Sequence, residues 1–181
     1  NTKLVWIETP TNPLLKLIDI EYISNLAKKY NAITVVDNTF SSPIFQNPIE
    51  FGADIVLHST TKYIGGHSDM VGGCHMVNNE SLTEQLKFLQ FAGGSVNAPI
   101  EAFLLLRSIK TLSLRMKKHN ENAFFIAKEM QKMNLFSEVI FPGLDNHPQH
   151  HLAQKQMRGF SGMISARIKG DYDTLKLFVS R

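Results

Sequence analysis

A lysine lies among hydroxyl side chains in the segment 53–69, which reads ADIVLHSTTKYIGGHSD. The segment begins with a short apolar run, typical of a buried strand, and then changes at once to polar residues. Ser59 and Thr61 flank Lys62 with hydroxyl groups that suit a phosphate, and the glycine pair that follows permits a sharp turn. A lysine amine attacks carbonyl groups when burial or a nearby charge activates it. The segment therefore indicates a Schiff-base lysine beside a phosphate site, although a polar surface turn with an exposed lysine also fits.

The wider spelling of this segment is similar to the lysine signature of the cysteine/methionine-metabolism family of pyridoxal-phosphate enzymes. The matching residues are 54–55, 59–64 and 66–68. The resemblance implies an α/β fold of the PLP-dependent transferase type (fold type I). In that fold a mostly parallel sheet with flanking helices precedes a smaller α+β C-terminal domain. It also implies the cofactor pyridoxal 5′-phosphate, a Schiff base on Lys62, and phosphate binding by Ser59 and Thr61.

Two upstream segments carry polar groups at the ends of expected strands. In the segment ETPTNP at 8–13, two prolines exclude regular structure, and Asn12 is held extended before a proline so that its amide can reach outward. A plain turn explains the same residues. The strand 33–37 ends in Asp37, which could cap a loop, accompany Mg²⁺ in a nucleotide site, or pair with a protonated pyridine nitrogen. No phosphate-binding glycine loop precedes it, which argues against a nucleotide binder.

Both segments also resemble signatures of the same family, and the resemblance covers essentially the whole chain. It implies that Asn12 hydrogen-bonds the phenolic oxygen of the cofactor and that Asp37, within Val-Asp-Asn-Thr at 36–39, keeps the pyridine nitrogen protonated. Thr39 is a further candidate for the surroundings of the cofactor. The implied enzyme cleaves a cystathionine-type amino acid by elimination through Lys62. The spelling favours the cystathionine γ-lyase branch over cystathionine γ-synthase, cystathionine β-lyase and methionine γ-lyase, and an inactive binding module is a more distant alternative.

Strands and helices alternate along the part of the chain that carries these residues. We expect strands at 4–7, 33–37, 55–57 and 74–77, with a helix from an Asp19 cap to about Tyr30 between the first two. Strand, helix and strand form a parallel crossover unit. The apolar face of this helix is expected to contain Ile20, Ile23, Leu26, Ala27 and Tyr30.

Further helices are expected downstream, joined by loops. Ser81 with Glu84 predicts a capping box for a helix at 82–91, and Asn97 predicts the cap of a helix that ends at Ile109. The segment 41–43 is expected to start a loop, and 47–52 to form a short helical turn. A long amphipathic helix is expected at 112–133, and strands at 139–141 and 162–168.

The chain is expected to divide near Thr111. Residues 1–111 would form part of a large cofactor-binding domain, and residues 112–181 the linking helix and the start of the C-terminal domain. The chain begins without methionine and stops at Arg181 within a segment that reads as helix, so we expect a central piece of a longer enzyme. By resemblance, the arginine for the substrate carboxylate lies beyond this piece. A tyrosine stacked on the cofactor, and a phosphate clamp lent by a neighbouring subunit, lie before it.

Composition bounds the remaining functions. The net charge of +3 without long runs of one sign predicts no nucleic-acid partner, and no apolar run is long enough to predict a membrane helix. Cys74 is the one cysteine, which is typical of a reducing, cytoplasmic protein. His147 and His151 have a metal-like spacing, but a proline lies between them and we predict no metal site. The resemblance implies an amino-acid substrate and a homotetramer whose active sites are shared between subunits.

Overall fold

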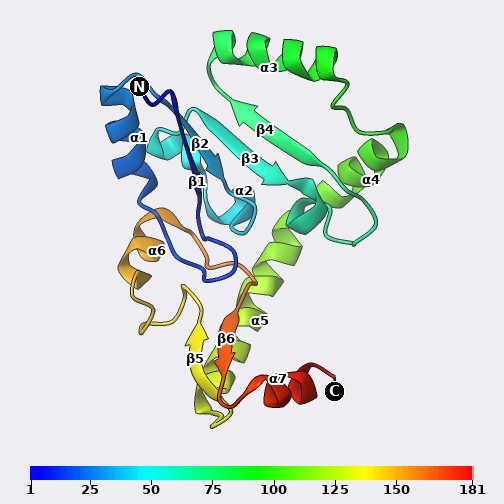
Figure 1. The fold of residues 1–181 in the computed structure, drawn as a ribbon. Coiled ribbons are helices and arrows are strands. Elements are labelled where there is room, and N and C mark those ends of the chain that lie inside the picture. Colours follow the sequence, from blue (N-terminus) through cyan, green and yellow to red (C-terminus); the bar gives the residue numbers. More distant parts are fainter. Residues whose placement is uncertain (181) are drawn as a thin grey trace.

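The computed structural model of the chain describes residues 1–180, which form two sheets and the helices around them (Figure 1). The larger sheet has four strands in the order β1 (Leu4–Glu8), β2 (Ile33–Asp37), β3 (Ile55–Ser59) and β4 (Gly73–Val77). β1, β2 and β3 are parallel, and β4 runs antiparallel to β3. The smaller sheet pairs β5 (Phe136–Ile140) with β6 (Ser165–Ile168) in antiparallel orientation. The expected mostly parallel α/β architecture is confirmed.

The helices lie around and between the two sheets. They are α1 (Ile20–Lys29), α2 (Ser42–Phe45), α3 (Glu80–Gly93), α4 (Pro99–Ile109), α5 (Leu112–Lys132), α6 (His150–Gln156) and α7 (Tyr172–Val179). Two single turns, η1 (Pro48–Phe51) and η2 (Thr60–Ile64), come directly before and after β3. In Figure 1 the long helix α5 runs from the larger sheet to the smaller one, and α3 and α7 lie at opposite ends of the molecule. Among the described residues no helix is long and apolar enough to cross a membrane.

The register of the parallel strands fixes where the polar side chains lie. Asp37 is the partner of Glu8 in β1 and of Leu57 in β3, so β1 and β2 end level with each other and β3 extends two residues further. Because parallel strands end at the same edge of a sheet, the segments that follow β1, β2 and β3 all leave from one side. Asn12, Asp37 and Lys62 therefore belong to neighbouring strand ends, as the sequence predicted.

Helix α1 packs its buried stripe against the parallel strands. Asp19 caps the helix as expected, since its carboxylate accepts a hydrogen bond of 2.9 Å from the N–H of Tyr22. Ile20 joins Ile7, Val36 and Val56 in one buried cluster. Two members of the expected apolar face are wrong, because Leu26 is 40% exposed and Tyr30 is 73% exposed.

The reason for this error is the position of the stripe on α1. Its buried residues are Ile20, Ser24 and Ala27, which follow the four-then-three spacing of one helix face. Leu26 and Tyr30 lie off that stripe. The buried Ser24 faces Gly52 at the end of η1, where an added Cβ would lie 3.5 Å from the Ser24 Cβ.

Two predicted helix starts differ from the observed ones. Helix α3 begins at Glu80, because the side chain of Asn79 accepts a hydrogen bond of 2.9 Å from the N–H of Leu82, and the capping box expected from Ser81 does not form. Helix α4 begins after Ala98, whose N–H donates to Glu101 over 2.8 Å, instead of after an Asn97 cap.

The segment expected to start a loop at 41–43 instead leads into the short helix α2. The reason is a proline at its first turn, a position where the missing N–H removes no helical hydrogen bond. The remaining predicted strands and the helices at 47–52 and 112–133 are confirmed within a few residues.

Helix α5 contacts both sheets through different parts of its length. Near its start, Leu112 and Met116 pack with Phe45 and Ile64, next to the end of β3. Further along, Ala123 and Ala127 pack with buried residues of the smaller sheet region, including Val139 and Phe141. The predicted division at Thr111 falls at the start of this helix and stays a prediction.

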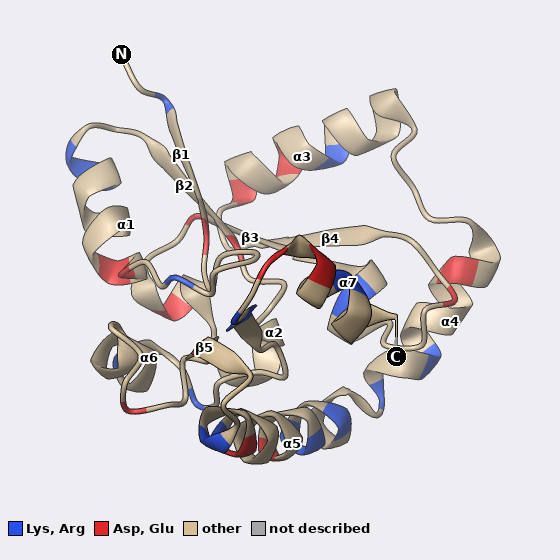
Figure 2. Cartoon of the chain, turned by 60° about the horizontal axis from the view of Figure 1, so that its bottom comes forward, with Lys and Arg blue, Asp and Glu red and all other residues tan. Residues whose placement is uncertain are grey.

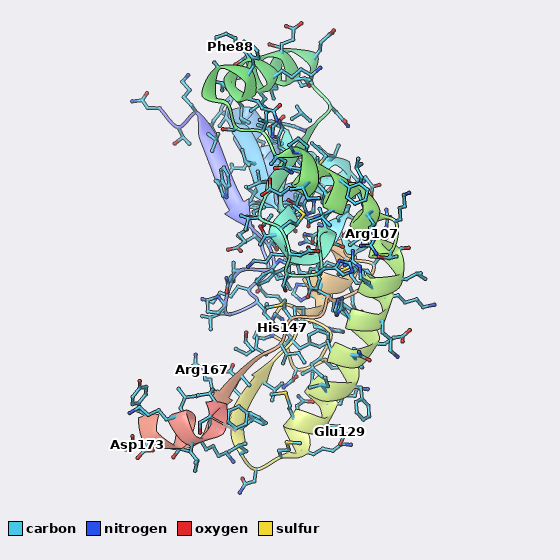
Figure 3. All side chains as sticks on the ribbon, turned by 90° about the vertical axis from the view of Figure 1, so that its right-hand side faces the viewer. Phe88, Arg107, Glu129, His147, Arg167 and Asp173 are labelled. Carbon is cyan, nitrogen blue, oxygen red and sulfur yellow. The ribbon has the colours of Figure 1, made fainter. Side chains whose placement is uncertain are left out.

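Helices α3 and α4 expose most of their apolar side chains. Large exposed residues on these two helices are Phe88, Leu89, Phe91, Ile100, Phe103, Leu106 and Ile109. Figure 3 shows α3, with Phe88 labelled, at one end of the molecule and α7, with Asp173 labelled, at the other. Helix α5, by contrast, has both acidic and basic residues along its length (Figure 2).

Replacement of Met116 by alanine tests the packing beneath the lysine turn. Met116 is fully buried, so we expect Met116→Ala to lower the free energy of unfolding by about 2–5 kcal/mol through lost burial and a residual cavity. The matched control is Leu114→Ala on the same helix, where the side chain is 70% exposed and little change is expected. Urea unfolding of the intact protein measures both, and equal losses in the two variants would contradict this packing.

Candidate functional site

Lys62 lies in a turn that is held at its first residues by the segment before β4. The N–H of Thr60 donates to the carbonyl of Gly72 over 2.9 Å, and the N–H of Gly72 donates to the hydroxyl of Thr61 over 3.0 Å. The turn closes through the N–H of Gly65, which donates to the carbonyl of Thr60 over 2.8 Å. Lys62 itself has φ −89° and ψ −124°, so the helical conformation is interrupted at the lysine.

A cavity of about 850 Å³ opens beside this turn. Lys62, Thr61 and Asn12 line it, so the structure brings together three of the residues predicted for the site. The cavity is large enough for a small organic ligand, since ligand pockets are typically 300–1,000 Å³. Asp37, Thr39 and Ser59 do not line it.

The other three predicted residues form a hydrogen-bonded group at the ends of β2 and β3. Thr39 donates from its hydroxyl to the carboxylate of Asp37 over 2.6 Å, and its N–H donates to the same oxygen over 3.0 Å. The N–H of Ser59 in turn donates to the Thr39 hydroxyl over 2.8 Å. Thr39 therefore ties the carboxylate of one strand end to the backbone of the next. The cofactor-binding roles of these three residues stay predictions.

Tyr63 is a residue of the cavity that the sequence did not identify. Its hydroxyl accepts hydrogen bonds from the N–H of Gly162 over 3.1 Å and from the hydroxyl of Ser161 over 3.2 Å. Burial raises the pKa of the Tyr63 phenol above its ordinary value, and these hydrogen bonds oppose the rise. Tyr63 thus connects the lysine turn to the segment that leads into β6. Its position directly after Lys62 is the feature of the sequence that could have indicated a place in the cavity.

His119 and Met163 also line the cavity, and no sequence motif predicts a role for either. His119 projects from α5, which is expected only as an amphipathic helix, and its ring lies 5.3 Å from the ring of Tyr63. Met163 follows Lys62 by about a hundred residues in the chain. Only the packing of α5 and of the segment before β6 against the lysine turn brings these side chains to the cavity.

His58 is a buried titratable group directly before this site. It is 1% exposed, and within the described residues neither ring nitrogen has a hydrogen-bond partner. Burial lowers the pKa of His58 to about 4, although the negative charge of Asp37 acts in the opposite direction. The imidazole is therefore neutral near pH 7. A neutral ring keeps positive charge out of the interior behind the strand ends.

The histidine-rich segment at the start of α6 forms local contacts. The Nδ1 atom of His147 accepts a hydrogen bond of 3.1 Å from the N–H of Gln149. The Nδ1 atom of His150 lies 2.8 Å from the carbonyl of Pro142. Among the described residues, no three His, Cys, Asp or Glu side chains gather in a metal-binding arrangement.

Comparison with known proteins gives the family of this chain. The family described as Cys/Met metabolism PLP-dependent enzyme matches residues 1–181, and the chain belongs to it. A probable cystathionine gamma-synthase of Herpetosiphon aurantiacus is 54% identical over 181 residues, which are 100% of this chain and 57% of that protein. A cystathionine gamma-lyase of Dictyostelium discoideum is 51% identical over 178 residues, which are 98% of this chain and 46% of that protein.

A solved structure is similarly close. The crystal structure of cystathionine gamma synthase from Xanthomonas oryzae pv. oryzae in complex with cystathionine matches with a TM-score of 0.96 and 48% identity, covering 98% of this chain and 46% of that one. The chain thus spans about half the length of the relatives it matches. The family resemblance read from the sequence is confirmed, and the branch within the family is not separated by these similarities.

The side chains present fit the cofactor of this family by their chemistry. Lys62 carries the amine that the cofactor aldehyde would take, and Asp37 carries the carboxylate that would hold a proton on its ring nitrogen. Thr61 and Asn12 add a hydroxyl and an amide to the cavity wall that carries the lysine. The donor set therefore contains one group for each polar part of pyridoxal phosphate.

His58 predicts how the stability of the protein depends on pH. Because the pKa of His58 is lowered from 6.5 to about 4 on folding, the unfolded chain binds a proton more readily between these values. Stability is therefore lost as the pH falls from about 6.5 towards 4, by up to about 3 kcal/mol from this group.

We expect His58→Leu to remove this part of the acid sensitivity. The measurement is the free energy of unfolding of the intact protein by urea at several pH values between 4 and 7. His75→Leu, at an exposed histidine on the neighbouring strand, is the matched control and should keep the wild-type slope. An unchanged slope in His58→Leu would contradict the burial of a neutral ring.

Proposed function

We propose that the protein carrying this chain is a pyridoxal-phosphate-dependent enzyme that acts on the carbon–sulfur bond of a cystathionine-type amino acid. The observation that carries the proposal is the placement of Lys62, with Thr61 and Asn12, in one cavity at the ends of parallel strands. Membership of the Cys/Met metabolism PLP-dependent family supports it. An inactive binding module with the same fold is the more distant alternative, and turnover by the intact protein excludes it.

Six residues are proposed to hold the cofactor. Lys62 is the attachment point, and Ser59 and Thr61 bind the phosphate. Asp37 holds a proton on the pyridine nitrogen, and Asn12 donates to the phenolic oxygen. Thr39 orients the Asp37 carboxylate through the 2.6 Å hydrogen bond. When bound, pyridoxal phosphate supplies an electron sink that stabilises negative charge at the substrate Cα.

The side chains of the protein have separate proposed roles in the reaction. The amine of Lys62 would act as the base that removes the proton at the substrate Cα and as the group that moves protons at the adjacent carbons. The carboxylate of Asp37 is held by two donors from Thr39, so it stays fixed while the proton remains on the ring nitrogen. Tyr63 and Met163 form part of the cavity wall.

Within the family we propose cystathionine γ-lyase activity, with γ-synthase, β-lyase and methionine γ-lyase activity as alternatives. The support is the spelling of the signature segments at 8–13, 36–39 and 59–69. Similar identities to a gamma-synthase and a gamma-lyase support the family-wide chemistry equally. These segments manage the cofactor, and the leaving group is selected by other residues.

We further propose that the protein is a cytoplasmic homo-oligomer, a tetramer, with active sites shared between subunits. The exposed apolar residues of α3 and α4 support assembly, because contiguous apolar surface is typical of protein–protein contacts. The proposed substrate is a small amino acid, and no nucleic-acid or membrane partner is included.

Chemical trapping tests the cofactor and its attachment point. Borohydride reduces the carbon–nitrogen bond between a lysine and pyridoxal phosphate, and peptide mass mapping then locates the adduct. We expect the adduct on Lys62 of the intact protein, and none there in Lys62→Ala. Lys117→Ala, at an exposed lysine on α5, is the control and should be labelled like the wild type. An unlabelled Lys62 in protein supplied with the cofactor would overturn the proposal.

Product identity tests the branch of the family. Cystathionine and water give cysteine, 2-oxobutyrate and ammonia by γ-elimination, or homocysteine, pyruvate and ammonia by β-elimination. We expect 2-oxobutyrate and cysteine in equal amounts from the intact protein, and neither from Lys62→Ala. Pyruvate with homocysteine would indicate a β-lyase. Formation of cystathionine from an O-acylated homoserine and cysteine, without 2-oxobutyrate, would indicate a γ-synthase.

A further inference from the structure

Arg115 binds the backbone of the lysine turn from α5. Its Nη1 donates to the carbonyl of Tyr63 over 2.6 Å, and its Nη2 donates to the carbonyl of Ile64 over 3.3 Å. These two carbonyls belong to the residues that follow Lys62 directly. The guanidinium therefore binds the backbone of the second half of the turn, whereas Gly72 binds the first half.

The guanidinium is itself fixed by the start of α5 and the end of α4. Its Nη2 also donates to the carbonyl of Ser108 over 3.0 Å, and its Nε donates to the hydroxyl of Thr111 over 3.1 Å. Four hydrogen bonds to neutral oxygens use most of the five N–H donors of an arginine. Within the described residues Arg115 forms no ion pair with a carboxylate.

The chain leaves space for this group at one glycine. A Cβ added to Gly66 would lie 2.1 Å from Nη1 and 2.7 Å from Cζ of Arg115, and Gly66 has φ +72°. The space beside the turn is therefore matched to the guanidinium. Burial lowers the pKa of Arg115, which fits a cation held among backbone carbonyls instead of in water.

An unpaired, partly buried arginine with this geometry needs an explanation beyond charge balance. Placing a cation among neutral oxygens has a desolvation cost. The planar guanidinium binds two successive carbonyls, so it fixes the direction of the backbone between them. Both carbonyls are within two residues of the lysine, where the helical conformation of η2 is interrupted. Arg115 adds side-chain donors to the backbone hydrogen bond from Gly65 to Thr60 that closes the turn.

We propose that Arg115 is a positioning residue for Lys62, holding the backbone of the turn so that the lysine amine keeps one direction at the cavity. The inference rests on the proposed role of Lys62. Arg115 does not line the cavity, so it acts through the turn and not on a bound molecule. Gly66 is required for this arrangement, because a side chain at this position would overlap the guanidinium.

The first test compares Arg115→Met with Arg115→Lys and with the control Arg107→Met. Methionine keeps the length of the side chain without its donors, and lysine keeps the charge without the fork. Arg107 is exposed on α4 and is labelled in Figure 3. We expect kcat of the intact enzyme to fall by about 100-fold in Arg115→Met with little change in KM, because misplacement of a reacting group by about 1 Å has an effect of this size.

Arg115→Lys should restore part of this loss, since an ammonium can reach one carbonyl, and Arg107→Met should match the wild type. A fall in thermal stability with unchanged kcat in Arg115→Met would overturn the proposal. So would a full restoration by lysine, because it would show that charge alone matters.

The second test does not use the loaded enzyme. In protein stripped of cofactor, acetic anhydride labels free lysine amines, and peptide mapping gives the labelling of Lys62 relative to the exposed Lys118. We expect the pH dependence of this ratio to change in Arg115→Met and to stay as in the wild type in Arg107→Met. An identical pH profile in both variants would mean that Arg115 only stabilises the fold.

Gly66→Ala keeps the proposal testable if Arg115→Met does not fold. The added methyl group displaces the guanidinium, so this variant should reproduce the altered Lys62 labelling with Arg115 present. In the Arg115→Met background the further effect of Gly66→Ala should be smaller, since only the backbone conformation remains affected. Normal labelling in Gly66→Ala would overturn the inference. If borohydride leaves no adduct on Lys62 of the wild type, the proposed function fails instead.

Discussion

The in-register parallel pairing of β1, β2 and β3 is the constraint on which the rest of the structure depends. It places Glu8, Asp37 and Leu57 side by side, so three connecting segments leave from one edge of the sheet. Each segment then brings one kind of polar group: an amide, a carboxylate or an amine. Thr39 strengthens this pairing at the strand ends, because its hydroxyl joins the carboxylate at the end of β2 to the backbone at the end of β3. A shift of one residue in either pairing would separate these groups and move alternate side chains to the other face of the sheet.

Most of the central fold could be predicted because its signals are short-range. The strands at Ile33–Asp37 and Ile55–Ser59 are apolar runs bounded by polar residues, and the Asp19 cap acts on the adjacent turn. The errors at the helix starts arose where competing local caps were present. Asn79 lies two residues before Ser81 and captures the N–H of Leu82, and the choice between two such caps depends on where the preceding strand ends.

The candidate site could be predicted only for the part that the lysine and its neighbours carry. Lys62, Thr61 and Asn12 share a cavity as expected, since strand ends bring them together. His119 and Met163 join the same cavity because α5 and the segment before β6 dock on the turn, and no spacing along the chain encodes such docking. The hydrogen bond from Gly162 to the Tyr63 hydroxyl is one contact between these distant segments.

The wall of the cavity, from Asn12 to Met163, is drawn from nearly the whole length of the chain. Contacts of such large sequence separation stabilise the fold only after the loop-closure entropy has been overcome. The cavity is complete only where the segment that leads into β6 is docked on the lysine turn, through the hydrogen bond from Gly162 to the Tyr63 hydroxyl. The integrity of the cavity therefore depends on the docking of the two sheet regions and not on the parallel strands alone.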